Sequence, residues 1–423
     1  MTTTKNNEHK KLNFSSEREQ SQACLNSAEH EKNQGRKVLN VPNSTDKGNV
    51  IRNVPHLRFP EFEGEWEDFL INDVCSEFKS GKNIKADSIS ESGEYPVYGG
   101  NGLRGYTSSY NHEGLYVLIG RQGALCRNVR SVHGKTFITE HAIAVAGNEI
   151  SNTSFLHYLF VKMNLGQYSD QSAQPGLAVN KLLKIKVVLP SVSEQTKIAR
   201  FLSLLDERIA TQNKIIEDLK KLKSAIIDYA INSLDTDFAK FGSLYEMAGE
   251  GGTPTTSNAS FYDNGKIPFI KIDDLKQKYL TENKDFITEL GLQKSSAWLV
   301  PTHSILFSNG ATIGEISITT YPVCTKQGIL GIVPKQNIDV EFLYYFMSSS
   351  YFKKAVSRIV TEGTMKTAYL KDINNILCPI PTKEKQKEIA KIPSALNTKI
   401  DFEQSILKLF CSQKQYLLRQ MFI

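Results

Sequence analysis

The sequence predicts an α+β protein in which two strand-rich domains form a tandem pseudo-twofold repeat, separated by two long antiparallel coiled-coil helices. Three observations lead to this expectation. One segment occurs twice, without a gap, in the chain of 423 residues. The apolar residues of that segment recur in the steps of three and four that are typical of a coiled coil. The sequence before each copy is typical of short strands joined by Gly-rich turns.

The repeat is the main organisational feature of the chain. Residues 189–231 align with residues 380–422 at a constant offset of 191, as shown by Pro190 and Pro381. Identical or similar residues meet along the whole segment: Gln195 with Gln386, Leu205 with Leu396, Ile209 with Ile400, and Lys223 with Lys414. Such a duplication predicts two structurally equivalent halves.

Each copy carries a long and narrow apolar stripe, and both stripes are interrupted at equivalent places. Gln212 and Lys223 interrupt the first stripe, and Glu403 and Lys414 interrupt the second. Matching interruptions favour a shared register between partner helices. The alternative is that each helix packs only on its own globular domain. The expected pairing seam consists of Ile198, Leu202, Leu205, Ile209, Ile216 and Leu219 in the first helix, and Leu396, Ile400, Leu407 and Phe410 in the second.

The ends of the two helices can also be predicted. Ser193 and Glu194 can begin the first helix, and its pattern continues to Asn232. About 39 residues at 1.5 Å per residue give a rod of roughly 58 Å. Pro393 falls inside the second helix, where proline removes a hydrogen bond and clashes with the preceding turn. We therefore expect a kink or a restart at Pro393, with Ser394 nearby.

These features divide the chain into five expected segments. Residues 1–50 form an arm, 51–190 and 234–381 are the two strand-rich domains, and 191–233 and 382–423 are the central and C-terminal helices. The arm is rich in Asn, Lys, Glu, Ser and Thr, so we expect it to be mobile. It lacks the apolar region of a secretory signal, and no segment approaches the ~18 apolar residues of a membrane-spanning helix. We therefore expect a cytoplasmic protein that does not contact a membrane.

The two domains before the helices resemble each other more loosely. Phe155-Leu156 and Tyr158 in the first half correspond to Phe342-Leu343 and Tyr345 in the second. Both groups are expected on short helices, with their apolar side chains in the core. The expected N-caps are Asn152 or Thr153 in the first half and Asp339 in the second.

Motifs for catalysis are not found. Residues 100–105 read GNGLRG and match GxGxxG formally, but residues 106–110 read as a turn or a strand instead of the helix of a dinucleotide site. Residues 249–254 are Gly-rich but lack the lysine of a P-loop. The histidines and cysteines show no metal-ligand spacing, and no [DNS]PP[YF] tetrapeptide of an amino-methyltransferase occurs. We therefore expect a non-catalytic protein with no cofactor or metal of its own.

Local charge favours nucleic acid as the ligand. The net charge of +6 is small, but residues 114–139 and 342–361 contain no Asp or Glu and several basic residues. Basic side chains neutralise phosphates, whereas Arg, Lys, Asn and Gln read the edges of bases. The candidate DNA-binding residues lie on expected loops: Asn101, Arg104, Arg121, Gln122, Arg127 and Gln174 in the first half, and Lys271, Asn309, Thr312, Lys326, Gln327 and Lys366 in the second.

With these features the sequence resembles the specificity (S) subunit of type I restriction-modification systems, over about residues 51–423. Residues 55–62 read PHLRFPEF, residues 98–102 read YGGNG, and residues 251–254 read GGTP. Most specific is the LP dipeptide at 189–190, followed by EQ at 194–195 and KIA at 197–199, together with its second copy. Each motif is weak alone, but the full set, twice over at this spacing, is specific.

The resemblance implies two target-recognition domains, each followed by a conserved helix, with the helices paired antiparallel as a spacer. It implies binding of a bipartite site in double-stranded DNA and recruitment of two methyltransferase (modification) subunits, which restriction/translocase subunits join. S-adenosylmethionine, ATP and Mg would then be bound by the partner subunits. The alternative function is a coiled-coil scaffold or adaptor without DNA specificity. A nuclease or methyltransferase fused to a recognition domain would need motifs that are not found.

Overall fold

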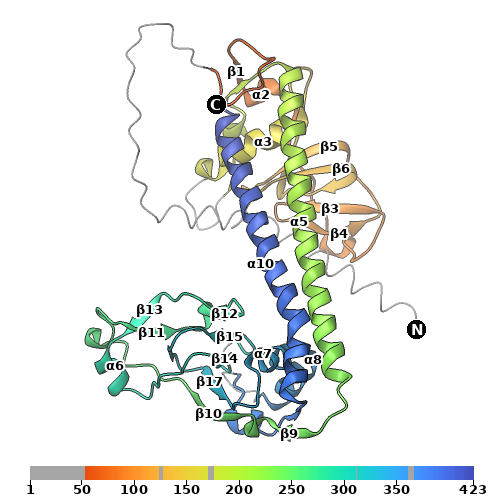
Figure 1. Cartoon of the computed structure of the whole chain (residues 1–423). Coiled ribbons are helices and arrows are strands. Elements are labelled where there is room, and N and C mark those ends of the chain that lie inside the picture. The colour runs from red at the N-terminus through yellow and green to blue at the C-terminus, as the bar shows by residue number, and fades with distance from the viewer. Residues whose placement is uncertain (1–52, 123–126, 170–175, 311, 361–365) are drawn as a thin grey trace. The chain divides into compact units, whose positions relative to one another are not determined.

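In the computed structural model the chain forms two compact units. Unit 1 comprises Met1–Asn213 and Ser405–Ile423, and unit 2 comprises Lys214–Gln404. The expected arm and the candidate Gln174 lie outside the described residues. No helix within the described part of the chain is long and apolar enough to cross a bilayer. The structure describes residues 53–122, 127–169, 176–310, 312–360 and 366–423 (Figure 1).

Unit 1 is built on a six-stranded sheet with the strand order β2-β7-β5-β6-β3-β4. Strand β6 is antiparallel to β5 and parallel to β3. Strand β1 pairs with β8, which joins the start of the domain to its end just before the long helix. The elements are β1 (Glu67–Leu70), α2 (Ile71–Val74), β2 (Cys75–Ser80), β3 (Tyr95–Gly99), β4 (Gly102–Thr107), β5 (His112–Gly120), β6 (Val129–Ile138), β7 (Ala142–Gly147), α3 (Thr153–Met163), α4 (Val179–Leu182) and β8 (Lys186–Leu189).

Unit 2 contains a five-stranded sheet with the order β10-β17-β14-β15-β12, a three-stranded sheet β13-β11-β16, and the pair β18-β9. The pair β9–β18 joins the ends of this domain as β1–β8 does in unit 1. The expectation of two strand-rich α+β domains is confirmed. The elements are β9 (Phe238–Lys240), β10 (Tyr245–Glu250), β11 (Ile267–Ile270), β12 (Tyr279–Leu280), β13 (Asp285–Ile287), α6 (Glu289–Gln293), β14 (Ile305–Ser308), β15 (Ile316–Thr319), β16 (Cys324–Thr325), β17 (Ile329–Pro334), α7 (Val340–Ser348), α8 (Ser350–Ile359), α9 (Leu370–Ile373) and β18 (Leu377–Pro379).

Two long helices follow the strands, α5 (Val192–Asn232) and α10 (Lys383–Gln420). In unit 1, Asp206 of α5 pairs with Lys414 of α10 at 2.5 Å, and Arg208 lies over the ring of Phe410. Residue numbers therefore rise along α5 while they fall along α10, so the helices are antiparallel there (Figure 1). The coiled-coil pairing predicted from the heptad pattern is confirmed.

The same pairing occurs within unit 2, where Lys223 of α5 donates to Oδ1 of Asn397 in α10 at 2.9 Å. The 191-residue offset of the repeat relates Asp206 to Asn397 and Lys223 to Lys414. The polar contact in unit 2 is therefore the repeat-related copy of the contact in unit 1. A matched register of this kind is what the shared interruptions of the two stripes predict.

The structure buries or half-buries all ten expected seam residues. Ile198 and Leu202 are 2% and 0% exposed and belong to the core of unit 1, which also contains Leu417 of α10. In unit 2, Ile231 of α5 and Ala390 of α10 share one core. Each helix therefore contacts both its partner helix and a strand-rich domain, and packing on its own domain alone is excluded.

Helix α10 continues through Pro393 from Lys383 to Gln420, so the expected restart is wrong. Proline removes one backbone hydrogen bond, but Pro393 lies on the buried side of the helix. The next residue, Ser394, is hydrogen-bonded by Lys278 and Tyr345 of the unit 2 domain. Tertiary contacts on both sides of the proline thus hold the helix in place.

One glutamine at the start of each long helix fixes the adjacent domain. The side-chain amide of Gln195 donates to the carbonyls of Pro190 and Ile150 at 2.8 and 2.9 Å, and its Oε1 accepts from the Asn152 N–H at 2.8 Å. Gln386 makes the same three contacts with Pro381, Asn337 and Asp339. The two glutamines are 0% and 1% exposed. Because buried amides are costly to leave unpaired, these hydrogen bonds hold the start of each long helix to its domain.

The glutamine contacts reach the N-caps of α3 and α7. Asn152 and Asp339 each accept a hydrogen bond from the backbone N–H three residues on, at Phe155 and Phe342. These are two of the caps predicted from the sequence. Each short helix then brings a tyrosine, Tyr158 in α3 or Tyr345 in α7, into hydrogen-bond contact with a long helix.

Candidate nucleic-acid interface

In unit 1 the candidate residues come from loops that meet at the ends of neighbouring strands. The turn at Gly100 lies against the backbone of Gly120, Arg121 and His141. The peptide N–H of Arg121 donates to the His141 carbonyl, and its carbonyl accepts from the Leu177 N–H, both at 2.9 Å. The loops after β3, β5 and β6 and the segment before α4 therefore form one surface.

Several basic and amide side chains line this surface. Arg121 is half-buried, and its Nη1 donates to Oγ of Ser80 at 3.1 Å, which orients the guanidinium. Gln122 is exposed, and its Oε1 lies 3.2 Å from Nδ1 of His141. The exposed Asn101 lies in the turn between β3 and β4. Guanidinium and amide groups of this kind can contact phosphates and base edges.

Two further arginines flank the β3–β4 turn. The exposed Arg104 packs its aliphatic part against Gly99. Gly102 has a φ of +103°, and a Cβ there would lie 3.0 Å from the guanidinium of Arg130. A side chain at this position would therefore be strained and would displace Arg130.

The structure separates one candidate from this surface and adds others. Arg127 is exposed and packs against Gly166, in the turn after α3. Arg130, Ser80 and His141 join the surface although they were not among the candidates. The acid-free window 114–139 contains Arg130 and could have indicated it. Ser80 and His141 required knowledge of which strand ends are neighbours.

In unit 2 the equivalent loops also meet. The N–H of Lys326 donates to the Ile270 carbonyl at 2.9 Å, and the N–H of Gln327 donates to Oγ1 of Thr253 at 3.2 Å. These contacts join the loops after β10, β11 and β16. Thr253 was not a candidate, although it belongs to the GGTP motif. The candidates exposed in this unit are Thr312, Lys326, Gln327 and Lys366.

Two unit 2 candidates have other roles. Asn309 is 1% exposed, and its Nδ2 donates to the Ala368 carbonyl at 3.3 Å. In this structure the side chain is therefore enclosed and holds the loop before α9, instead of facing a ligand as expected of a DNA-binding candidate. The ammonium group of Lys271 forms an ion pair with Asp285 at 2.8 Å, and both side chains remain partly exposed.

The backbone of Asn309 nevertheless shows that it occupies the position in unit 2 that Arg121 occupies in unit 1. Its carbonyl accepts from the Ala368 N–H at 2.9 Å, just as the carbonyl of Arg121 accepts from Leu177. The repeat offset of 191 relates Leu177 to Ala368. The backbone of this surface is thus repeated, whereas its side chains differ.

The described residues show no arrangement for chemistry at these loops. The GNGLRG segment forms the β3–β4 hairpin, so it lacks the strand–helix geometry of a dinucleotide fingerprint. Within the described ranges, no group of three or more His, Cys, Asp and Glu side chains could hold a metal ion. The surface offers hydrogen-bond donors and positive charge.

Comparison with known proteins identifies the family. The model of the type I restriction modification DNA specificity domain matches residues 63–221 and 235–409. Together the two matches cover well over half of the chain. The chain belongs to this family. The resemblance found in the sequence motifs is confirmed, and the family consists of specificity subunits, a non-catalytic component of type I systems.

Individual relatives agree with this assignment. The chain is 37% identical over 183 residues to the type I restriction enzyme EcoprrI specificity subunit of Escherichia coli, which covers 42% of this chain and 44% of that protein. It is 25% identical over 385 residues to the MjaVIII specificity subunit of Methanocaldococcus jannaschii, covering 82% and 89%. The match to the E. coli protein thus spans less than half of its length.

A solved structure shows the same fold. The S subunit of the type I restriction-modification system from M. genitalium superimposes with a TM-score of 0.60 at 18% identity, covering 88% of this chain and 99% of that one. At this identity the likeness concerns the fold alone.

Proposed function

We propose that this specificity subunit reads a bipartite site in double-stranded DNA, with one half-site for each strand-rich domain and an unspecified gap between them. The observation that carries this proposal is the pair of loop surfaces in units 1 and 2. They lie at equivalent strand ends of a repeated scaffold but present different side chains, with Arg121 at one and Gln327 at the other. Phosphate contacts would place each domain, and base-edge contacts would specify its half-site.

The long helices would set the gap between the half-sites. The 41 residues of α5 correspond to about 61 Å at 1.5 Å per residue. Half-sites one helical turn apart are separated by about 34 Å, which is within reach of such a rod. The antiparallel register observed in each unit supports a spacer of defined length.

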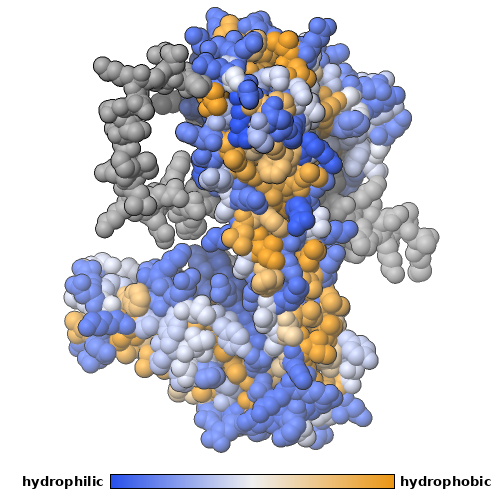
Figure 2. Space-filling view, turned by 45° about the horizontal axis from the view of Figure 1, so that its top comes forward, coloured by the Kyte–Doolittle hydropathy of each residue, from blue (hydrophilic) through white to orange (hydrophobic). Residues whose placement is uncertain are grey.

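The long helices also offer surface for partner proteins. Figure 2 shows hydrophobic surface along them, and contiguous exposed apolar residues commonly mark protein interaction sites. The large exposed apolar side chains of the two helices are Val192, Phe201, Leu204, Leu409 and Tyr416 in unit 1, and Ile215, Leu222, Tyr229, Ile392 and Phe402 in unit 2.

In the proposed complex, two methyltransferase subunits dock on these helices and restriction/translocase subunits join them. The partners bind S-adenosylmethionine, ATP and Mg²⁺ and carry out adenine methylation and cleavage. The role of this chain is to direct them to the site.

Selection from a random duplex library tests the proposal. The chain is purified together with a methyltransferase subunit of a type I system, and bound DNA is sequenced. The expected result is two short motifs at a fixed gap. Replacing residues 51–190 by the equivalent domain of another family member should change one motif only. No enrichment would favour the scaffold alternative, and a change in both motifs would contradict one half-site per domain.

A further inference from the structure

A tyrosine on a short helix attaches each strand-rich domain to the long helices. In unit 1, the hydroxyl of Tyr158 in α3 donates to Oδ2 of Asp206 at 2.9 Å. Lys414 pairs with the other oxygen of Asp206 and lies 5.7 Å from the Tyr158 ring centroid. In this attachment both charged groups belong to the long helices, and the domain supplies only the tyrosine.

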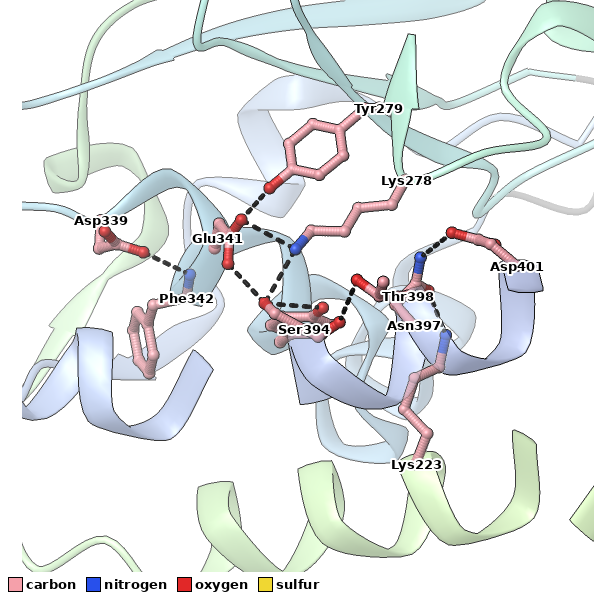
Figure 3. Close-up of polar contacts among 11 residues, drawn as sticks. Lys223, Lys278, Tyr279, Asp339, Glu341, Phe342, Ser394, Asn397, Thr398 and Asp401 are labelled. Carbon is pink, nitrogen blue, oxygen red and sulfur yellow. Dashed lines mark hydrogen bonds and ion pairs between the residues drawn. The ribbon is translucent and has the colours of Figure 1, made fainter. Parts of the chain in front are cut away.

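The attachment in unit 2 is constructed differently (Figure 3). The hydroxyl of Tyr345 donates to Oγ of Ser394 at 3.1 Å, and Nζ of Lys278 donates to the same oxygen at 2.9 Å. Lys278 also pairs with Glu341 at 2.9 Å. Glu341 in turn accepts from the hydroxyls of Ser394 and Tyr279. Here both the cation and the anion come from the domain.

Burial makes the lysine the decisive member of this group. The side chain of Lys278 is 3% exposed, and its ammonium lies 4.8 Å from the ring centroid of Tyr345 and 4.7 Å from that of Tyr279. Its backbone carbonyl accepts from the Ile318 N–H of β15, which ties it to the sheet. Removing one partner of a buried ion pair is strongly destabilising, because the other charge is left without compensation.

The repeat shows what changed between the two attachments. Asn397 stands in unit 2 where Asp206 stands in unit 1. Lys223, the counterpart of Lys414, still reaches Asn397, but the amide carries no charge. Tyr345, the counterpart of Tyr158, bonds to Ser394 instead. In α10 the anion stands four residues further along, at Asp401, which accepts from Nδ2 of Asn397 at 3.1 Å, and next to Tyr345 the domain supplies an ion pair of its own.

We propose that Lys278 is a positioning residue that locks the unit 2 domain to α10, and that the two attachment sites on the long helices are therefore not interchangeable. At the Asp206 attachment, the unit 1 site requires from its domain only a tyrosine in the place of Tyr158, while Arg58 of that domain separately pairs with the buried Glu194 of α5 at 2.8 Å. The unit 2 site requires a domain that also brings a buried lysine with its glutamate. This inference rests on the proposed function. It limits which recognition domains can replace the unit 2 domain.

Hydrogen exchange on the full chain tests the attachment without DNA. Lys278→Met should speed exchange of the α7 amides by at least about tenfold, because the domain opens from the helix more often. The control is Lys276→Met, which removes a lysine whose side chain is 74% exposed two residues away and should leave exchange unchanged. If Lys278→Met does not fold, Glu341→Gln removes the anion of the same pair and should speed exchange in α7.

A rescue separates positioning from a general structural role. Nδ2 of Asn397 donates to Oδ2 of Asp401 at 3.1 Å, so an anion can be placed at position 397 only if the carboxylate at 401 becomes an amide. In the Lys278→Met, Glu341→Gln background, Asn397→Asp with Asp401→Asn places the anion of the unit 1 arrangement next to Lys223. This pair of changes should return α7 exchange to near the wild-type rate, whereas in the otherwise native chain it should have little effect. The proposal is overturned if Lys278→Met behaves like Lys276→Met, or if Asn397→Asp with Asp401→Asn does not rescue. A wild-type chain that fails to select DNA would remove the proposed function but not the attachment.

Discussion

Among the candidate side chains of unit 1, we expect Arg121 to contribute most to the proposed reading of DNA. Its peptide group is fixed at both ends and its guanidinium is oriented by Ser80. Arg121→Gln should weaken binding to the preferred duplex by about 1–3 kcal/mol and relax the sequence preference in one half-site. Titration of labelled duplexes measures this effect. Arg200→Gln, which removes an exposed arginine of α5, is the control; equal losses for both variants would contradict a specific role for Arg121.

We predict that His157 makes the stability of unit 1 dependent on pH. Its Nδ1 is buried and has no hydrogen-bond partner among the described residues. Burial, and to a smaller extent Lys414, lowers the pKa of His157 to about 4 from its usual 6.5, although Asp206 acts in the opposite direction. Between those two values the unfolded chain binds a proton that the folded chain excludes. The free energy of unfolding should therefore fall as pH falls from 6.5 to 4.

The size of this fall follows from the pKa shift. One pKa unit corresponds to about 1.4 kcal/mol, so the loss should reach about 3 kcal/mol. Urea titrations from pH 7 to pH 4 measure it. His157→Phe should make the free energy of unfolding nearly independent of pH in this range. His133→Gln, which replaces an exposed histidine, should leave the pH dependence unchanged. An unchanged slope in His157→Phe would show that other groups cause the pH dependence.

At the residue scale, the sequence predicts which residue types are available for a site but not what surrounds each side chain. Asn309 has the chemistry of a base reader, yet the loop before α9 encloses it. No pattern in the sequence distinguishes Lys278 from other lysines, because a lone lysine is usually solvated. Only the fold places it between Glu341 and two tyrosine rings. Burial of single polar residues depends on loop paths, which have no periodic signal.

At the scale of elements, the long helices were the most predictable part of the molecule. The expected central helix at 191–233 is observed as Val192–Asn232, because a heptad pattern sustained over about 40 residues leaves little alternative. The restart at Pro393 was wrong because local propensity was overridden by packing on both sides of the proline.

Pro393 should still lower the stability of the helix. Pro393→Leu restores the missing amide donor and the residue type of its repeat counterpart, Leu202. We expect the free energy of unfolding to rise by about 1–2 kcal/mol, less than the full cost of a helical proline because the site is already packed. Thermal denaturation measures the change, with Ile392→Leu at the exposed neighbouring position as the control. A lower melting temperature would show that the ring itself is needed at the seam.

The proposed spacer makes a separate prediction about the length of the helices. Inserting one heptad after Ile209 and one after Ile400 keeps the seam in register and lengthens the pair by about 10.5 Å. At 3.4 Å per base pair, the gap between the half-sites should grow by about three base pairs while both half-site sequences stay the same. Library selection with the lengthened chain measures the gap. An unchanged gap would exclude the helices as the spacer.

At the scale of the whole molecule, the repeat predicted the architecture and the family, and the structure added how each domain is attached. Gln195 and Gln386 make the same contacts in both units, so the repeat preserves the junction between helix and domain. The loop surfaces could not be derived in the same way. Ser80 and His141 meet Arg121 only through the strand order of the sheet, which no local pattern in the sequence specifies.

Methylome sequencing of the source organism, with and without this gene, tests the central claim most directly. A subunit that reads a bipartite site for adenine methylation predicts that one motif, composed of two short halves at a fixed gap, loses its methylation in the deletion strain. Expression of the intact gene should restore that motif, and the Arg121→Gln variant should alter one half only. A methylome that is identical with and without the gene would contradict the account.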